Sequence, residues 1–125
     1  MFKLIEGLPP NILAIEAIGT VTHDDYRKVL IPKAEAMIAK GPVRMLNVIG
    51  KQFVGFELEA LWDDGAFGLK HGREFTRVAV VADQAWLRAS VSLFAPLIPA
   101  EVRLFSLSEL AGAKDWIVAP QKAAV

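Results

Sequence analysis

The sequence has no cysteine, so it offers neither a disulfide nor a thiolate that acts as a nucleophile or a zinc ligand. It has no excess of charge either: 14 Lys and Arg residues balance 14 Asp and Glu residues. Without a general attraction for a polyanion, nucleic acid is not an expected partner. No apolar run approaches the roughly 20 residues that a membrane-spanning helix needs, so we expect no integral membrane segment.

The sequence also lacks the short motifs that indicate an enzyme. It contains no nucleophile elbow, phosphate-binding loop or dinucleotide-binding glycine pattern. Its two histidines, His23 and His71, lie far apart in the sequence, and no cysteine accompanies them, so no metal site is indicated. We therefore expect a protein that is not an enzyme and uses no cofactor. The alternative is an enzyme that uses His71 with Lys70 and an acidic neighbour.

A high apolar content is the main feature that the sequence does have. Hydrophobic residues make up 54% of the 125 residues and charged residues 22%, which is more apolar than a typical soluble domain. The length fits one domain, which we place at 1–118, with a frayed tail at 119–125. Apolar side chains that the core does not use are expected to contact a partner, a ligand, a membrane surface or a second copy of the chain. Glu6 and Pro9 interrupt the first apolar residues, so we expect no signal peptide and a cytoplasmic protein.

Apolar patterns and turn signals predict the order of strands and helices. Two strands, at 2–6 and 12–18, form a hairpin, and further strands are predicted at 43–49, 77–82 and 101–105, the last at an edge. Helices are predicted at 22–40, near 57–64, at 84–98 and from 106 to about 118. This alternation indicates an α/β fold: a mixed sheet of four to five strands with about four helices, in which a hairpin precedes parallel crossovers.

Helix starts carry the clearest local signals. Thr22 and Asp25 have the spacing of a capping box, and so do Ser106 and Glu109. Pro32 lies inside the first predicted helix, where it removes a backbone donor, so we expect a kink or a new helix start at that point.

Glycines shape the prediction for the segment after the third strand. The stretch from Gly50 to Phe56 is interpreted as a loop, and Gly65 and Gly68 predict that the second helix loosens into a turn. Asp83 follows the valine-rich fourth strand and is expected to cap the next helix.

The order of these elements resembles that of the SpoIIAA-like family, a branch of the STAS (sulphate transporter and anti-sigma factor antagonist) superfamily. The resemblance runs from the first strand to Trp116, and the segments that carry it are Met45-Leu46-Asn47-Val48, Phe53-Val54-Gly55-Phe56-Glu57, Leu61-Trp62-Asp63-Asp64, Phe67-Gly68-Leu69-Lys70-His71 and Arg77-Val78-Ala79-Val80-Val81-Ala82-Asp83. The family implies a small α/β sandwich that is mostly bacterial and cytoplasmic.

The best-understood members of this family imply a phosphorylation switch. Anti-anti-sigma proteins carry it on a Ser or Thr at the start of the helix after the third strand. Here no Ser or Thr lies between Val43 and His71, and the corresponding region is Lys51 to Glu57. Because the switch needs a hydroxyl to phosphorylate, this loop does not support one. The resemblance then implies an apolar variant that binds a small apolar or lipid-like ligand and associates with a membrane surface.

We place the candidate site at the carboxyl ends of the parallel strands, where ligands of open α/β sheets bind. The candidate ligand-binding residues are Asn47, Phe53, Phe56, Trp62, Asp83, Trp86 and Phe94. We hypothesise that the helix at 84–98 moves against the sheet and admits an apolar ligand between Phe53, Phe56, Trp86 and Phe94.

Simpler interpretations compete at several of these positions. Helical spacing places Trp62 and Phe67 in the core, and the apolar run at 93–99 is either a buried connection or a movable flap. Asp63 and Asp64 are expected at a solvated helix end. The alternative function is a protein-protein regulator of the anti-sigma factor antagonist type.

Overall fold

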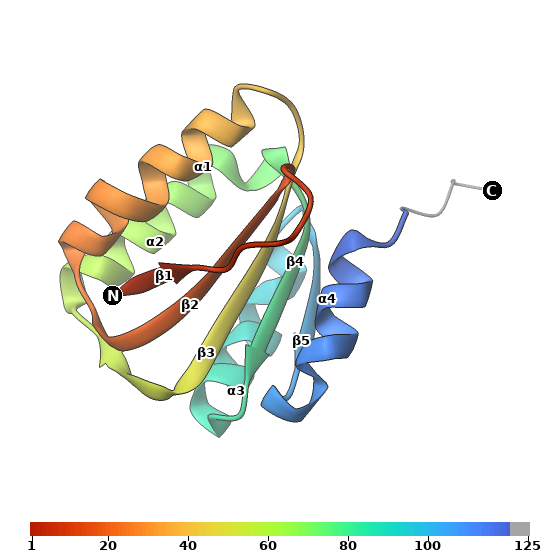
Figure 1. Cartoon of the computed structure of the whole chain (residues 1–125). Coiled ribbons are helices and arrows are strands. Elements are labelled where there is room, and N and C mark those ends of the chain that lie inside the picture. The colour runs from red at the N-terminus through yellow and green to blue at the C-terminus, as the bar shows by residue number, and fades with distance from the viewer. Residues whose placement is uncertain (121–125) are drawn as a thin grey trace.

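An antiparallel hairpin begins the sheet, and parallel strands complete it (Figure 1). In the computed structural model, which describes residues 1–120, β1 (Phe2–Leu4) runs antiparallel to β2 (Ile12–Val21). The strands β3 (Val43–Phe56), β4 (Phe75–Ala82) and β5 (Glu101–Phe105) continue in parallel, and their order across the sheet equals their order in the chain. The predicted mixed sheet is confirmed, with β5 at an edge as expected.

Helices connect the parallel strands and cover both faces of the sheet. The helices are α1 (Ile31–Ile38), α2 (Leu58–His71), α3 (Ala85–Phe94) and α4 (Leu110–Val118). Shorter turns are η1 (Asp25–Leu30), η2 (Gly72–Glu74), η3 (Ala95–Leu97) and η4 (Leu107–Glu109). The first three helices share one core with the sheet, whereas α4 packs on the opposite face (Figure 1).

Two apolar cores result from the alternation of side chains along the strands. On the face of α1, α2 and α3, the fully buried residues include Ile15, Ala34 and Ala60. On the face of α4, Leu46 and Val81 pack with the buried residues of that helix, Ala113 and Ile117.

The two predicted capping boxes are present. The Thr22 N–H donates to Asp25 Oδ2 at 2.8 Å, and the Asp25 N–H donates to Thr22 Oγ1 at 3.2 Å, which closes the reciprocal box. The Ser106 N–H donates to Glu109 Oε1 at 2.8 Å before α4. Pro32 stands in the first turn of α1, directly after the wide π-helical turn η1. The chain stays helical across this junction, so the irregularity expected at Pro32 is a change from π-helical to α-helical winding.

The prediction of a loop from Gly50 to Phe56 is wrong, because strand β3 includes these residues. Phe53 pairs with Gly19 of β2 and Phe56 pairs with Val21, after a bulge that shifts the register beyond Ala17. On the other side β4 ends at Ala82, opposite Ile49, so this part of β3 has β2 as its neighbour in the sheet. Gly19 has φ +65°, a conformation that glycine adopts without strain.

The second helix is longer than predicted, because α2 continues through Gly65 and Gly68 to His71. The fourth strand also starts two residues earlier than predicted, at Phe75. These differences leave the connection between β3 and β4 almost entirely helical, which determines where the side chains of the candidate site lie.

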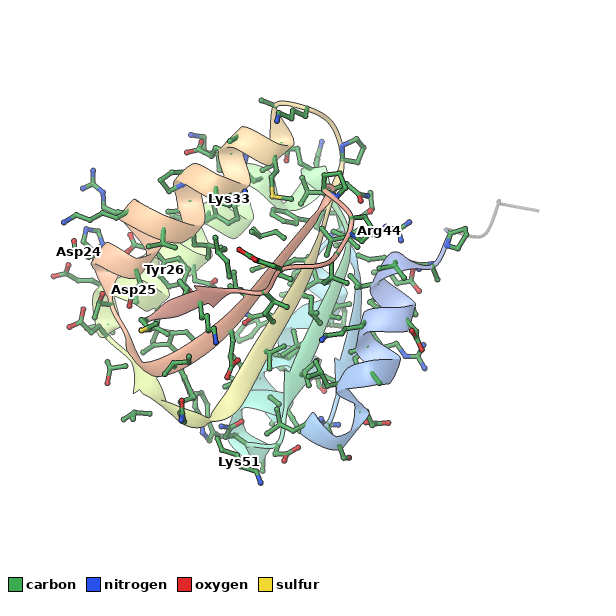
Figure 2. The ribbon with its side chains drawn as sticks, viewed as in Figure 1. Asp24, Asp25, Tyr26, Lys33, Arg44 and Lys51 are labelled. Atoms are coloured by element: carbon green, nitrogen blue, oxygen red, sulfur yellow. The ribbon has the colours of Figure 1, made fainter. Side chains whose placement is uncertain are left out.

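Two arginines hold the end of α4 against the sheet. Arg77 Nη1 donates to the carbonyl oxygens of Trp116 at 2.9 Å and Ala119 at 3.1 Å, and Arg44 Nη1 donates to Ile117 O at 2.9 Å. Figure 2 shows Arg44 near the end of the sheet opposite to Lys51. The predicted frayed tail lies outside the described residues from 121 on.

Candidate functional site

Three of the predicted site residues form an aromatic cluster at the carboxyl rim, the edge of the sheet where the parallel strands end. The ring centroids of Phe53 and Phe56 lie 5.0 Å apart in an edge-to-face arrangement, and Phe53 stacks on Trp86 at 6.5 Å. Phe53 and Phe56 are half-buried against the core, whereas Trp86 is 55% exposed. The cluster thus joins the end of β3 to the start of α3.

The other four predicted residues lie elsewhere. Asn47 stands in the middle of β3, and Trp62 lies on the exposed side of α2. Phe94 follows Trp86 by eight residues of helix, or about 12 Å along the axis, so it lies toward the opposite end of α3. Asp83 does not cap α3 as predicted: its Oδ1 accepts a hydrogen bond from the Leu107 N–H at 2.9 Å, and Gln84 occupies the cap position.

The outward side of α2 is an apolar stripe. We call Leu58, Leu61, Trp62 and Leu69 the outer face of α2; their side chains are between 51% and 92% exposed. With Gly65 and Ala66 they line a shallow hollow of about 470 Å³ in which no side chain is charged and the indole of Trp62 carries the single polar side-chain group. The prediction that Trp62 belongs to the core is therefore wrong. Leu58, Leu61 and Leu69 share the helical spacing of Trp62, but that spacing does not show that they face outward.

Polar side chains instead occupy much of the inner face of α2. Asp63 pairs with the ring of His23, and Asp64 Oδ1 accepts a hydrogen bond from the Tyr26 hydroxyl at 3.1 Å. The expectation of a helix end is wrong, because both carboxylates lie within α2, but Asp64 as a residue is exposed, as expected. Burial raises the pKa of Tyr26, and the Asp64 carboxylate raises it further, so the phenol remains a hydrogen-bond donor.

Small and aromatic residues complete the inner face. Ala60 is fully buried, and Phe67 packs its ring on Phe75 of β4 with centroids 5.8 Å apart, so the prediction that Phe67 joins the core is confirmed. His71 Nε2 lies 3.2 Å from Glu35 of α1. Helix α2 therefore turns its leucines and Trp62 outward, whereas Ala60 and Phe67 face the core.

The segment from α3 to η3 also exposes apolar side chains. Leu93 is 70%, Phe94 56% and Leu97 78% exposed, so the prediction of a buried connection at 93–99 is wrong for these residues. A Cβ placed on Gly72, directly after α2, would lie 3.7 Å from Pro99, which follows η3. The exposed apolar surfaces of α2 and α3 thus belong to the same side of the sheet.

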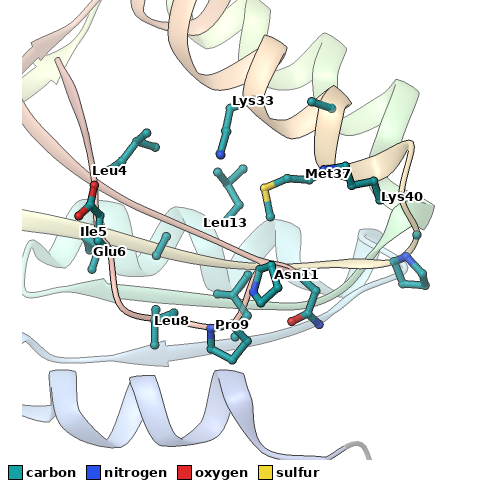
Figure 3. A pocket seen from close by; sticks show the side chains of 16 residues that line it. Leu4, Ile5, Glu6, Leu8, Pro9, Asn11, Leu13, Lys33, Met37 and Lys40 are labelled. Carbon is teal, nitrogen blue, oxygen red and sulfur yellow. The ribbon is translucent and has the colours of Figure 1, made fainter.

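A second hollow, of about 540 Å³, lies between the turn of the hairpin and α1, at the opposite end of β2 from the aromatic cluster (Figure 3). Lys33, Met37 and Lys40 line it from α1, and Glu6 lines it from the hairpin. The sequence interpretation did not identify this hollow, because residues from distant segments form it.

Within residues 1–120, no three or more His, Cys, Asp or Glu side chains are grouped so that they could hold a metal ion. Neither of the two hollows includes His71, the residue on which the enzymatic alternative depends. No helix in the described part of the chain is long and apolar enough to cross a membrane.

Comparison with known proteins agrees with this architecture. The model of the SpoIIAA-like family matches residues 12–118, so the chain belongs to the SpoIIAA-like family. A crystal structure of an uncharacterised protein with a SpoIIAA-like fold from Shewanella loihica PV-4 is 30% identical, with a TM-score of 0.74; the match covers 94% of this chain and 92% of that one. A search of curated proteins gave no match.

A more distant structure shows the fold alone. The anti-sigma factor antagonist SpoIIAA, in its unphosphorylated form, is 15% identical, with a TM-score of 0.61 and coverage of 90% of this chain and 96% of that one. In this chain the cap residue of the helix after the third strand is Glu57, whose Oε1 accepts a hydrogen bond from the His23 N–H at 3.3 Å. A carboxylate thus stands at the beginning of α2.

Proposed function

We propose that this STAS-type module binds a lipid-like apolar molecule and contacts a membrane surface with α2 and α3, without a phosphorylation switch. The observation that carries the proposal is the outer face of α2, which places several large apolar side chains in water. Leaving such a side chain exposed forgoes roughly 1.5 to 3 kcal/mol relative to its burial. Surfaces of this kind usually mark an interaction site.

The lining of the α2 hollow favours lipid over a protein partner. Specific protein interfaces combine an apolar centre with hydrogen bonds, on the order of one per 100 to 200 Å². The hollow offers apolar side chains only, with Trp62 among them, and tryptophan is favoured at the boundary between lipid and water. Acyl chains meet the leucines of this surface without leaving a polar group unpaired, and the indole N–H of Trp62 finds a partner at the polar boundary of the bilayer.

The helices cover the central strands β3 and β4 only in part, which supports the proposal that a ligand binds between the helices and the sheet. Met45 and Asn47 of β3 and Val78 of β4 are only half-buried, although both strands have neighbours on each side. Met45 and Val78 pack on the core that α1, α2 and α3 share. An acyl chain between these helices would cover side chains that the protein itself leaves partly exposed.

Vesicle binding tests the membrane contact. In a variant with Leu61→Gln and Leu69→Gln, we expect the partition onto phosphatidylcholine vesicles to fall roughly 30-fold, since two half-inserted leucines contribute about 2 kcal/mol. The matched control is Val118→Gln, which replaces a 41% exposed side chain on α4, across the sheet, and leaves the partition unchanged. Equal partition of both variants and the natural sequence would refute the membrane contact.

Native mass spectrometry of the purified protein tests the ligand. We expect adducts with the mass of a lipid, and their loss after organic extraction. Protein that carries no such adduct and takes none up from vesicles contradicts ligand binding.

The second candidate is a protein-protein regulator, which the family match favours. It predicts that the protein binds no vesicles, but captures one defined protein through α2. Trp62→Asp abolishes that capture and leaves the stability unchanged, because Trp62 is 75% exposed. A homodimer through an exposed helix or an edge strand stays a prediction, which sedimentation velocity tests.

A further inference from the structure

Asn47 is a polar residue in the middle of an apolar sheet face. In the register of the sheet it lies between Ile15 of β2 and Val80 of β4, and laterally paired residues of parallel strands point to the same face. Ile15 is fully buried and Val80 is 7% exposed, both in the core shared with α1, α2 and α3. The Asn47 side chain therefore points to the side of the sheet that these helices cover.

The Oδ1 atom of Asn47 is buried and has no hydrogen-bond partner among residues 1–120. A carboxamide offers two donors and an acceptor, and buried groups of this kind are almost always paired. Where such a group lacks a protein partner, a bound molecule or water takes that place. Asn47 as a whole is only half-buried, so part of the residue stays open to solvent on the side of the sheet that the helices cover.

The surroundings of Asn47 define which head group fits. Its neighbours across the sheet are Ile15 and Val80, and the nearest residues of β3 on the same face are Met45 and Ile49. None of these four is charged, so the sheet offers no counter-charge to an ionised carboxylate or phosphate at this position, and burying such a group without one is strongly unfavourable. A neutral hydroxyl or carboxamide pairs with the Asn47 amide without that cost.

We propose that Asn47 binds the head group of the ligand, and that the ligand is an apolar chain with a neutral hydroxyl or carboxamide. This inference rests on the proposed function, because it names the chemistry of the same ligand. Asn47 then determines specificity: it selects an uncharged polar lipid over both a pure hydrocarbon and an ionised fatty acid. The apolar chain extends from Asn47 along the half-buried side chains of β3 and β4.

Calorimetric titration with three probes of equal chain length tests the inference: 1-decanol, decanoate and n-decane. We expect the natural protein to bind 1-decanol more tightly than the other two. In Asn47→Val, affinity for 1-decanol falls about 5- to 10-fold, the worth of one hydrogen bond, while affinity for n-decane is unchanged. Asn47→Ser, which keeps a hydroxyl, recovers part of the preference for 1-decanol.

The outcomes separate this inference from the function on which it rests. If the natural protein binds none of the three probes, the proposed function fails and the inference fails with it. If it binds 1-decanol and n-decane alike, or if Asn47→Val binds 1-decanol unchanged, only the role of Asn47 is refuted. Urea unfolding adds a second readout: Asn47→Val should be at least as stable as the natural protein, and a lower midpoint would reveal an internal partner of the amide.

Discussion

Removing the Tyr26 hydroxyl tests whether polar contacts hold α2 with its apolar face outward. The hydroxyl donates to Asp64 Oδ1 at 3.1 Å, while the ring is 3% exposed and packs edge-to-face on Phe2 with centroids 5.1 Å apart. Tyr26→Phe keeps the ring and deletes only the donor. A hydrogen bond to a charged group contributes roughly 1.5 to 3 kcal/mol, but Asp64 is exposed as a residue, so water replaces the lost donor and we expect a loss of about 1 kcal/mol.

The loss should appear first in α2, because the deleted bond joins that helix to η1. Native-state hydrogen exchange read by mass spectrometry separates this effect from global unfolding. We expect the amides of α2 to exchange about 5-fold faster, as a change of about 1 kcal/mol implies, while those of β4 change less. Exchange that stays unchanged in α2, or that rises equally in α2 and β4, would refute the reasoning.

Lys28→Met provides the matched control for Tyr26→Phe. Lys28 Nζ pairs with Asp24 at 3.4 Å, and both side chains are more than half exposed. Exposed ion pairs of this kind contribute roughly 0.2 to 1 kcal/mol or nothing measurable. The control changes a residue of the same turn without touching α2, so we expect its exchange pattern to match that of the natural protein.

Three further predictions concern stability. Arg77→Met leaves the carbonyl of Trp116 without its donor, so urea unfolding should show a loss of about 3 kcal/mol. The Ser106 backbone N–H lowers the pKa of Glu109 below its ordinary value of 4.5. That carboxylate therefore stabilises the fold above the ordinary value, and the advantage over Glu109→Gln should disappear in urea titrations as the pH falls through the folded pKa. Gly41 has φ +136° with nothing within 4 Å of an added Cβ, so Gly41→Ala should lower the midpoint of thermal unfolding through backbone strain of about 1 to 2 kcal/mol.

Local signals were sufficient for the order of the elements. The capping boxes at Thr22 and Ser106 depend on residues three positions apart, and apolar runs identify the buried strands without knowledge of their neighbours. Pro32 likewise acts on its own turn. Each of these signals is contained in a short stretch of sequence. The helices and strands that they mark can therefore be predicted from the sequence alone.

The extension of β3 was not predictable in this way. The two glycines at 50 and 55 are typical of a loop, and the segment is a strand because β2 continues beside it past Ala17. The bulge and the positive φ at Gly19 make that pairing possible. These features lie on the partner strand, more than 30 residues away, and no local pattern reports them.

The orientation of α2 also depends on distant residues. A helical stripe shows that one side of a helix is apolar, but it does not show which neighbour that side meets. His23 and Tyr26 pair with Asp63 and Asp64, so the carboxylates turn inward and the leucines of α2 turn outward. For the candidate site, the sequence grouped Phe53, Phe56 and Trp86, which do lie together, but it added Phe94, which lies at the other end of α3. Helical spacing also placed Trp62 in the core, where it does not lie.

Steric hindrance prevents α2 from rotating about its axis so that its outer face would turn toward the sheet. This hindrance explains why the outer face stays in water. Ala60 is fully buried, so the helix lies close to the sheet at a position that accepts only a small side chain. Turning the helix to bury Leu61 and Trp62 would require a wider gap and would release Asp63 and Asp64 from their partners. Because interiors are close-packed, such a gap would have to be filled. Under the proposed function, a lipid chain beneath the helix would fill that gap, and a bilayer that covers the outer face would remove the need to turn the helix at all.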